Sequence, residues 1–137
     1  MGGQTVKIAA DTNVLLRDVL QDDPAQSRIA RSALQSAELV SIHIAVLCEF
    51  VWVLRQGLKK PSAEVAGAIR ILMSSSNVVM ERSAVEAGLD VLEAGGDFAD
   101  GVIAYEGAWL GAEEFVSFDK ETVSILKSQG KRARLLG

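Results

Sequence analysis

The sequence predicts one α/β domain over residues 1–137, in which a mostly parallel sheet is covered by helices on both faces. Two observations predict this class. Short runs with strand-like composition alternate along the chain with longer segments that carry apolar residues at helical spacing. The chain has 137 residues, of which 49% are hydrophobic and 23% charged, so it can bury one core without disulfide help.

Five short, mostly apolar runs are predicted to form strands. They cover residues 5–10, 39–42, 77–80, 115–118 and 133–136. Each of the first four is followed by a segment with helical spacing. Strands that are joined through helices usually pair in parallel, so this order predicts a parallel sheet.

Helices are predicted over the segments between these strands. They cover residues 14–20, 24–37, 44–56, 62 onward, 84–94, 98–110 and 120–128. Three of their starts carry capping signals. Asp23 precedes Pro24, Ser83 and Glu86 form an S-x-x-E capping box, and Asp97 precedes the sixth helix.

Charge and cysteine content narrow the classes of function. The net charge of −4 argues, taken alone, against a general nucleic-acid binder, although bound metal ions would reverse the local sign. A single cysteine, Cys48, excludes an intramolecular disulfide. The longest apolar stretch, residues 44–54, is shorter than the roughly 20 residues of a membrane span, and no secretory signal is evident. We therefore expect a soluble, cytoplasmic protein that does not enter a membrane.

Several aspartates lie where a parallel sheet forms its binding sites. Asp11 directly follows the first predicted strand, and Asp119 directly follows the fourth. Asp97 and Asp100 open the helix before that fourth strand. Because sites in open α/β sheets form at the carboxyl ends of strands, we expect side chains from these distant segments to converge.

Glu49 is the only charged residue in the apolar segment 44–54. Burial of an ionised carboxylate without a partner costs several kcal/mol. The sequence therefore leaves two alternatives, an exposed position at the helix edge or a cationic partner, for which a metal ion is an attractive choice.

Converging carboxylates repel one another unless they are protonated or neutralised, and a divalent cation neutralises them. Carboxylate oxygens suit magnesium or manganese, which complete their coordination shells with water and phosphate oxygens. Such a site activates water and stabilises charge on a phosphoryl group, so phosphodiester hydrolysis is the natural reaction.

Four acidic runs in the sequence resemble the four acidic motifs of PIN domains. They are Asp11-Thr12-Asn13, Glu49 within its apolar helix, Asp97-Phe98-Ala99-Asp100 and Ser117-Phe118-Asp119-Lys120. No single run is specific, but their order and spacing match over residues 8 to 119. The chain looks closest to the VapC-like toxins of bacterial toxin–antitoxin pairs.

The resemblance implies a PIN-like three-layer fold, with a central, mostly parallel, twisted sheet of four to five strands flanked by helices. It also implies a ribonuclease toxin that depends on Mg²⁺ or Mn²⁺ and cuts RNA internally. By position, Asp11 and Asp100 would be direct metal ligands. Glu49 would act through water or orient the nucleophile, and Asp119 would complete the acidic pocket. The family further implies a homodimer and a cognate antitoxin that inserts a segment into the site.

Several side chains keep two interpretations at this stage. Asp97 is a helix cap or a supporting catalytic residue, and Thr12 and Asn13 contact the metal shell or cap a helix. Ser117 contacts the acidic cluster or is structural. The apolar helix with Trp52 belongs to the core or to a dimer interface. Basic side chains in several segments could follow an RNA backbone, and the sequence favours none of them.

Two other classes of function remain open. The first is a phosphatase or phosphotransfer enzyme on a related α/β fold. The D-x-D-x-T motif of haloacid-dehalogenase-like phosphatases would need a second acid where Asn13 stands. The second is a non-catalytic module that binds RNA or protein, against which the retention of all four acids argues. The sequence names neither the RNA nor the cleavage position, nor whether one or two metal ions bind.

Overall fold

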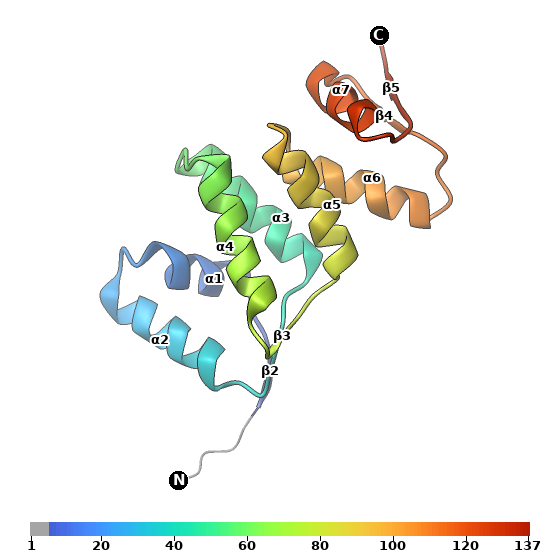
Figure 1. Cartoon of the computed structure of the whole chain (residues 1–137). Helices are drawn as coiled ribbons and strands as arrows, with labels where there is room; N and C mark the ends of the chain where they lie inside the picture. The colour runs from blue at the N-terminus through green and yellow to red at the C-terminus, as the bar shows by residue number, and fades with distance from the viewer. Residues whose placement is uncertain (1–5) are drawn as a thin grey trace. The chain divides into compact units, whose positions relative to one another are not determined.

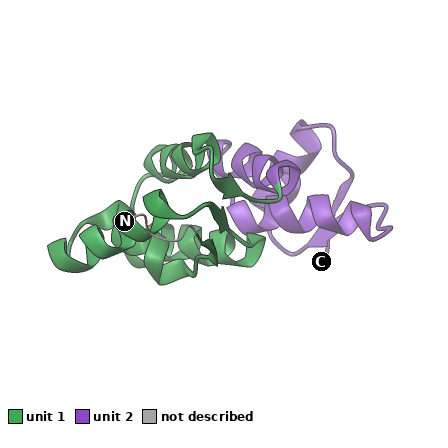
Figure 2. Ribbon diagram, turned by 90° about the horizontal axis from the view of Figure 1, so that it is seen from below, with its two compact units in different colours: residues 1–81 green, residues 82–137 purple. Residues whose placement is uncertain are grey.

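A computed structural model describes residues 6–137 (Figure 1). Thr5, the first residue of the first predicted strand, lies outside the described residues. The chain forms two compact units, residues 1–81 (unit 1) and residues 82–137 (unit 2), coloured separately in Figure 2. Each unit has its own strands, helices and acidic side chains, so each is described in turn.

Unit 1 contains a parallel sheet of three strands in the order β1–β2–β3. The strands are β1 (Lys7–Ala9), β2 (Leu39–Ser41) and β3 (Val78–Val79). The helices are α1 (Thr12–Leu20), α2 (Pro24–Ser36), α3 (Ile44–Trp52) and α4 (Ser62–Ser74). Ile8 pairs with Val40, and Val40 pairs with Val78. This register sets the carboxyl ends of β1 and β2 side by side, because Ala9 lies opposite Ser41.

The start of α2 follows the capping signal in the sequence. The Asp23 side chain accepts a hydrogen bond from the backbone N–H of Gln26 at 3.1 Å, and Pro24 occupies the first helical position. Proline fits there because its missing N–H would have had no partner within the helix. The predicted start of this helix is therefore confirmed.

The helix α3 is shorter than the sequence predicts. It ends at Trp52, and a π-helical turn, η1 (Val53–Gly57), continues the chain to the glycine that marks its end. The backbone N–H of Leu58 closes this turn on the carbonyl oxygen of Val53 at 3.0 Å. Apolar residues have nearly the same spacing in an α-helix and in a single π-helical turn, so the prediction continued the helix to residue 56. The Trp52 side chain is 63% exposed, which excludes it from the core.

Unit 2 contains the parallel strand pair β4 and β5 together with three helices. The elements are α5 (Arg82–Glu93), α6 (Phe98–Trp109), β4 (Phe115–Ser117), α7 (Lys120–Ser128) and β5 (Ala133–Leu135). A small buried cluster holds these elements together. Its members are Val91, Val123, Leu126 and Ala133.

Close packing between α5 and α6 depends on glycine. A Cβ atom added to Gly101 would lie 2.5 Å from the carbonyl oxygen of Ala87, and one added to Gly88 would lie 2.6 Å from the ring of Phe98. Real side chains do not approach this closely, so each helix needs glycine at the crossing. Gly101 directly follows Asp100, so the close packing of Gly101 against α5 also sets the position of Asp100 relative to α5.

One predicted helix start is wrong. The helix α5 begins at Arg82, so Ser83 lies inside its first turn. A residue that caps a helix through its side chain needs a non-helical backbone, and Ser83 has a helical one. The S-x-x-E pattern of Ser83 and Glu86 is therefore not a capping box in this protein.

The predicted α/β class is confirmed. All five predicted strands form within residues 6–137, every strand pairing is parallel, and helices flank the strands. Their hydrogen bonds join three strands in unit 1 and two in unit 2. Among the described residues, none of the helices has the length and apolar composition to cross a membrane.

Candidate active site

Asp11 occupies the junction between β1 and α1. It is the N-cap of α1, and its Oδ1 accepts a hydrogen bond from the backbone N–H of Val14 at 3.1 Å. The residue is exposed. Because the cap uses one carboxylate oxygen, the other oxygen of Asp11 is available to a ligand at the carboxyl end of the sheet in unit 1.

Thr12 connects this junction to Glu49 on α3. The Thr12 hydroxyl donates a hydrogen bond to Oε1 of Glu49. The contact brings a carboxylate from the middle of α3 to the residue that follows Asp11. Unit 1 therefore holds the Glu49 carboxylate beside the residue that follows Asp11.

Glu49 is exposed, which decides between the two alternatives that the sequence left open. It lies at the helix edge, so the energetic argument that a buried carboxylate needs a cationic partner does not apply to it. Exposed residues recur on α3 at Ala45, Glu49 and Trp52, which share one stripe of the helix. The remaining case for Glu49 as a site residue is its contact with Thr12.

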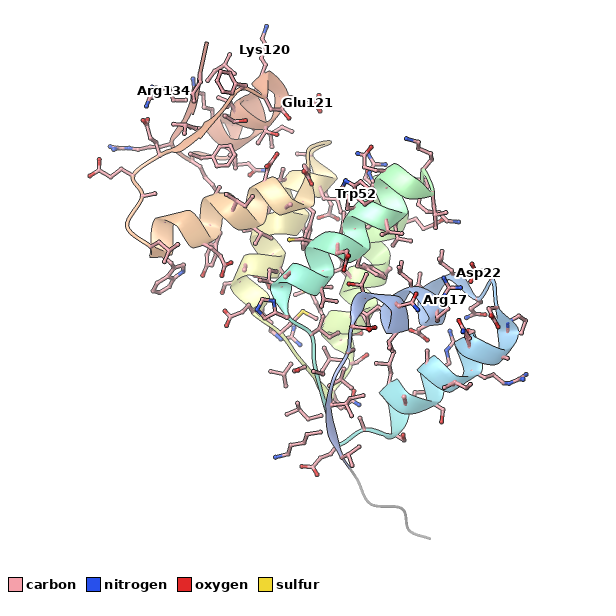
Figure 3. All side chains as sticks on the ribbon, turned by 180° about the vertical axis from the view of Figure 1, so that it is seen from behind. Arg17, Asp22, Trp52, Lys120, Glu121 and Arg134 are labelled. Carbon is pink, nitrogen blue, oxygen red and sulfur yellow. The ribbon has the colours of Figure 1, made fainter. Side chains whose placement is uncertain are left out.

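In unit 2, Asp119 occupies the equivalent junction between β4 and α7. Its Oδ1 accepts hydrogen bonds from the backbone N–H groups of Glu121 at 3.0 Å and Thr122 at 3.3 Å. The Ser117 hydroxyl oxygen in turn accepts a hydrogen bond from the backbone N–H of Asp119 at 2.9 Å. Ser117 thus helps to fix the backbone that carries the acid. Figure 3 labels Lys120 and Glu121, which begin the helix beside this cap.

A residue that the sequence analysis missed joins two of the acids. The hydroxyl of Thr122 lies 3.1 Å from Oδ2 of Asp100 and 3.1 Å from Oδ2 of Asp119. Thr122 is buried, with 2% of its surface exposed. A hydroxyl has one proton to donate, so it satisfies only one carboxylate at a time. The D-x-x-T spacing of residues 119 and 122 carries a weak signal for the cap contact, but none for Asp100.

Asp100 carries an electrostatic penalty in this position. Burial raises the pKa of its carboxyl above the ordinary value, and the negative charges of Asp97 and Asp119 raise it further. The hydrogen bond from Thr122 acts in the opposite direction but does not cancel these effects. The folded protein therefore holds a carboxylate whose negative charge is poorly compensated.

The donor chemistry of the four acids fits a divalent cation. Within neither unit do residues 6–137 contain three or more His, Cys, Asp or Glu side chains grouped to hold a metal ion. Each unit instead contains two of these acids, Asp11 and Glu49 in unit 1 and Asp100 and Asp119 in unit 2 (the acidic pairs). Carboxylate oxygens are the ligands that magnesium and manganese prefer, and an added positive charge would relieve the penalty at Asp100.

Two further residues from the acidic runs have defined surroundings. Asp97 is the N-cap of α6, where its side chain accepts a hydrogen bond from the backbone N–H of Ala99 at 3.1 Å. The predicted capping role of Asp97 is confirmed, and its charge also acts on Asp100. Asn13 does not cap α1, because Asp11 does so. It lines a pocket with Asp11 instead.

The fold and these contacts define an α/β protein whose acidic residues follow parallel strands and begin helices. Comparison with known families agrees with that class. The family model of the PIN domain matches residues 8–126, a range that includes all four acids, and the chain belongs to the PIN domain family. PIN domains are typically nucleases, which act on nucleic acids. No curated protein matches the chain.

Proposed function

We propose that the protein is a divalent-metal-dependent endoribonuclease, formed by residues 1–137 as one PIN domain. The observation that carries the proposal is the contact of Asp100 and Asp119 with a single hydroxyl proton on Thr122. The hydroxyl can donate to only one of the two Oδ2 atoms at a time, which leaves negative charge on the other, and a nuclease uses such charge to bind a metal ion.

The residues have separate tasks in this proposal. Asp11 and Asp100 would bind Mg²⁺ or Mn²⁺ directly, Glu49 would hold or orient a water molecule, and Asp119 would complete the acidic pocket. The bound ion would supply Lewis acidity toward the phosphodiester and lower the pKa of water. The Thr12 and Thr122 hydroxyls keep Glu49, Asp100 and Asp119 in place by the hydrogen bonds described above.

Purified protein should cleave single-stranded RNA internally when Mg²⁺ or Mn²⁺ is present and should leave it intact in metal-free buffer. Denaturing gels of a labelled RNA measure this directly. Asp11→Asn should lose the activity, whereas Asp90→Asn should keep it, because Asp90 is an exposed aspartate of α5 outside the acidic pairs. Failure to cut any RNA with either metal, or strong hydrolysis of small phosphomonoesters, would contradict the proposal.

We further propose that the nuclease is a VapC-like toxin of the cytoplasm, inhibited by a cognate antitoxin. The support is the resemblance of the four acidic runs to this group. Induced expression in a bacterial cell should arrest growth. Co-expression of a short open reading frame next to the coding sequence should restore it. If the protein cleaves RNA in vitro but its expression does not slow growth, the toxin role would be contradicted and the ribonuclease activity would stand.

A homodimer is also proposed, on the same resemblance and on two exposed aromatic side chains. Trp52 is 63% exposed and Trp109 is 77% exposed, and the Trp109 ring lies edge to face with Tyr105 at 6.5 Å between ring centroids. Exposed indole rings are common at protein interfaces. Sedimentation equilibrium should give twice the chain mass of 14.6 kDa, and a single-chain mass over the micromolar range would count against the dimer.

A further inference from the structure

A pocket in unit 1 lies between α1 and α2 and begins at Asp11. Its volume is about 340 Å³, which is within the range of pockets that hold small molecules. Both polar and apolar side chains line it. The lining residues are Asp11, Asn13, Val14, Arg17, Gln26, Ile29, Ala30 and Ala33. Anything that fills this pocket lies beside a carboxylate that the proposed function assigns to the metal ion.

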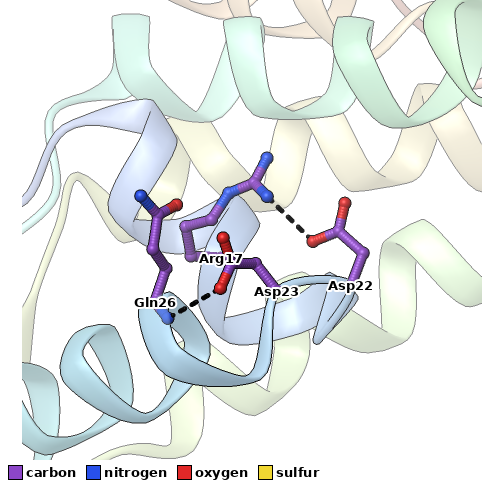
Figure 4. Close-up of polar contacts among 4 residues, drawn as sticks. All are labelled: Arg17, Asp22, Asp23 and Gln26. Atoms are coloured by element: carbon purple, nitrogen blue, oxygen red, sulfur yellow. Dashed lines mark hydrogen bonds and ion pairs between the residues drawn. The ribbon is translucent and has the colours of Figure 1, made fainter.

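Arg17 is the only cation among the side chains that line the pocket. Its guanidinium donates to Oδ1 of Asp22 at 2.8 Å, a contact that Figure 4 marks with a dashed line. Its Nε is buried and has no hydrogen-bond partner among residues 6–137. Buried donors are rarely left without an acceptor, so the Arg17 guanidinium has hydrogen-bonding capacity that Asp22 does not use.

The residues around Arg17 leave its guanidinium available. The neighbouring Asp23 is engaged at the start of α2 with the backbone N–H of Gln26. Asp22 is an exposed partner, with 56% of its side chain accessible, and ion pairs with exposed partners are weak. The guanidinium can therefore exchange Asp22 for a stronger acceptor. Phosphate oxygens fit this group best, because two of them match its parallel N–H donors.

We propose that this pocket binds the nucleotide next to the scissile phosphodiester, with Arg17 holding a phosphate of the RNA substrate. The inference rests on the proposed ribonuclease function. Val14, Ile29 and Ala30 provide an apolar surface for the sugar and base, and Gln26 and Asn13 provide amides that can meet a base edge. Asp11 also lines the pocket, and a metal ion held there, as in the proposed function, would compensate its charge.

The experiment is steady-state cleavage of a short, labelled single-stranded RNA in Mg²⁺ by the full chain and its variants. Arg17→Gln should raise KM about tenfold, as expected for the loss of a charged hydrogen bond, with little change in kcat. The slope of log KM against log salt should fall by about 0.7, the value for one phosphate contact on a single strand. Arg17→Lys should keep the salt slope and raise KM less.

Arg31→Gln is the matched control. Arg31 on α2 forms an ion pair with Asp18 on α1 at 2.9 Å, whereas Arg17 pairs with Asp22 in the connection between these helices, and Arg31 does not line the pocket. Its KM and salt slope should equal those of the wild type, which separates phosphate binding from the effect of losing a salt bridge between these helices. Thermal unfolding of each variant verifies that it is folded.

The outcomes distinguish this inference from the proposed function. Wild-type cleavage with a KM and salt slope unchanged in both Arg17 variants would overturn the inference and leave the proposed nuclease function intact. Equal rises of KM in Arg17→Gln and Arg31→Gln would also overturn it, because the effect would then be structural. A wild-type protein that cuts no RNA would remove the proposed function itself.

Discussion

Asp100→Asn should abolish RNA cleavage and, in metal-free buffer, stabilise the folded protein. The loss of activity is expected to be about 10²–10³-fold in kcat or greater, the range for removal of one preorganised electrostatic group. The gain in stability follows from the raised pKa of Asp100, since asparagine removes a charge that burial and two neighbouring aspartates disfavour. Asparagine can still accept the hydrogen bond from Thr122.

The pH dependence of unfolding measures this effect. The pKa of Asp100 is raised above its ordinary value of 3.8 in the folded state, so its ionisation penalty is fully present above the folded-state pKa. The penalty is relieved as the pH falls through that pKa, and it vanishes below the unfolded-state value. The difference in free energy of unfolding between Asp100→Asn and wild type should therefore be largest near neutral pH and shrink on acidification.

Magnesium should reverse the order of stability. A ligand at a hundredfold excess over its Kd stabilises a protein by about 2.7 kcal/mol, and only the wild type should gain this fully. Asp90→Asn provides the control, because it removes one exposed carboxylate of the same unit and should behave like the wild type in both conditions. An Asp100→Asn protein that is less stable than wild type at neutral pH without metal would contradict this account.

Thr122→Val should weaken metal binding and activity by about 10- to 100-fold, the range for loss of a group that orients metal ligands. Valine has nearly the shape of threonine, so the buried position stays filled while the proton shared by Asp100 and Asp119 is lost. Isothermal titration with Mn²⁺ and the rate of RNA cleavage measure the two effects separately.

Thr122→Ser is the matched control, because it keeps the hydroxyl and removes only a methyl group. It should retain most of the metal affinity even where it lowers the melting temperature. If both variants lost metal affinity to the same degree, Thr122 would be a packing residue and the assignment of its hydroxyl would be wrong.

The parts of the site that could be predicted from the sequence are those with local causes. Asp23 and Asp97 are followed directly by helix starts, so capping chemistry alone located them. Asp11 and Asp119 follow strands, and that order placed them at the junctions where the structure has them. Each of these predictions depended on residues within four positions of one another.

The parts that escaped prediction depend on helix phase or on distant contacts. Glu49 has apolar neighbours in sequence, but the helical turn places it on the exposed stripe of α3. Thr122 contacts Asp100, 22 positions away, only because α6 and α7 pack in one unit. A single sequence carries no record of such a contact. Ser83 shows the opposite error, in which a local motif was present but the helix began before it.

Asp11 and Asp119 cap helices in addition to their proposed catalytic roles, and this combination has an evolutionary consequence. Asp11 and Asp119 each commit one oxygen to starting a helix, and asparagine or serine performs that task nearly as well as aspartate. If the proposed function is correct, a single change of either residue would therefore abolish catalysis and leave the fold intact. Under that proposal, evolution could inactivate the protein through one substitution, and the gene would still encode a folded chain.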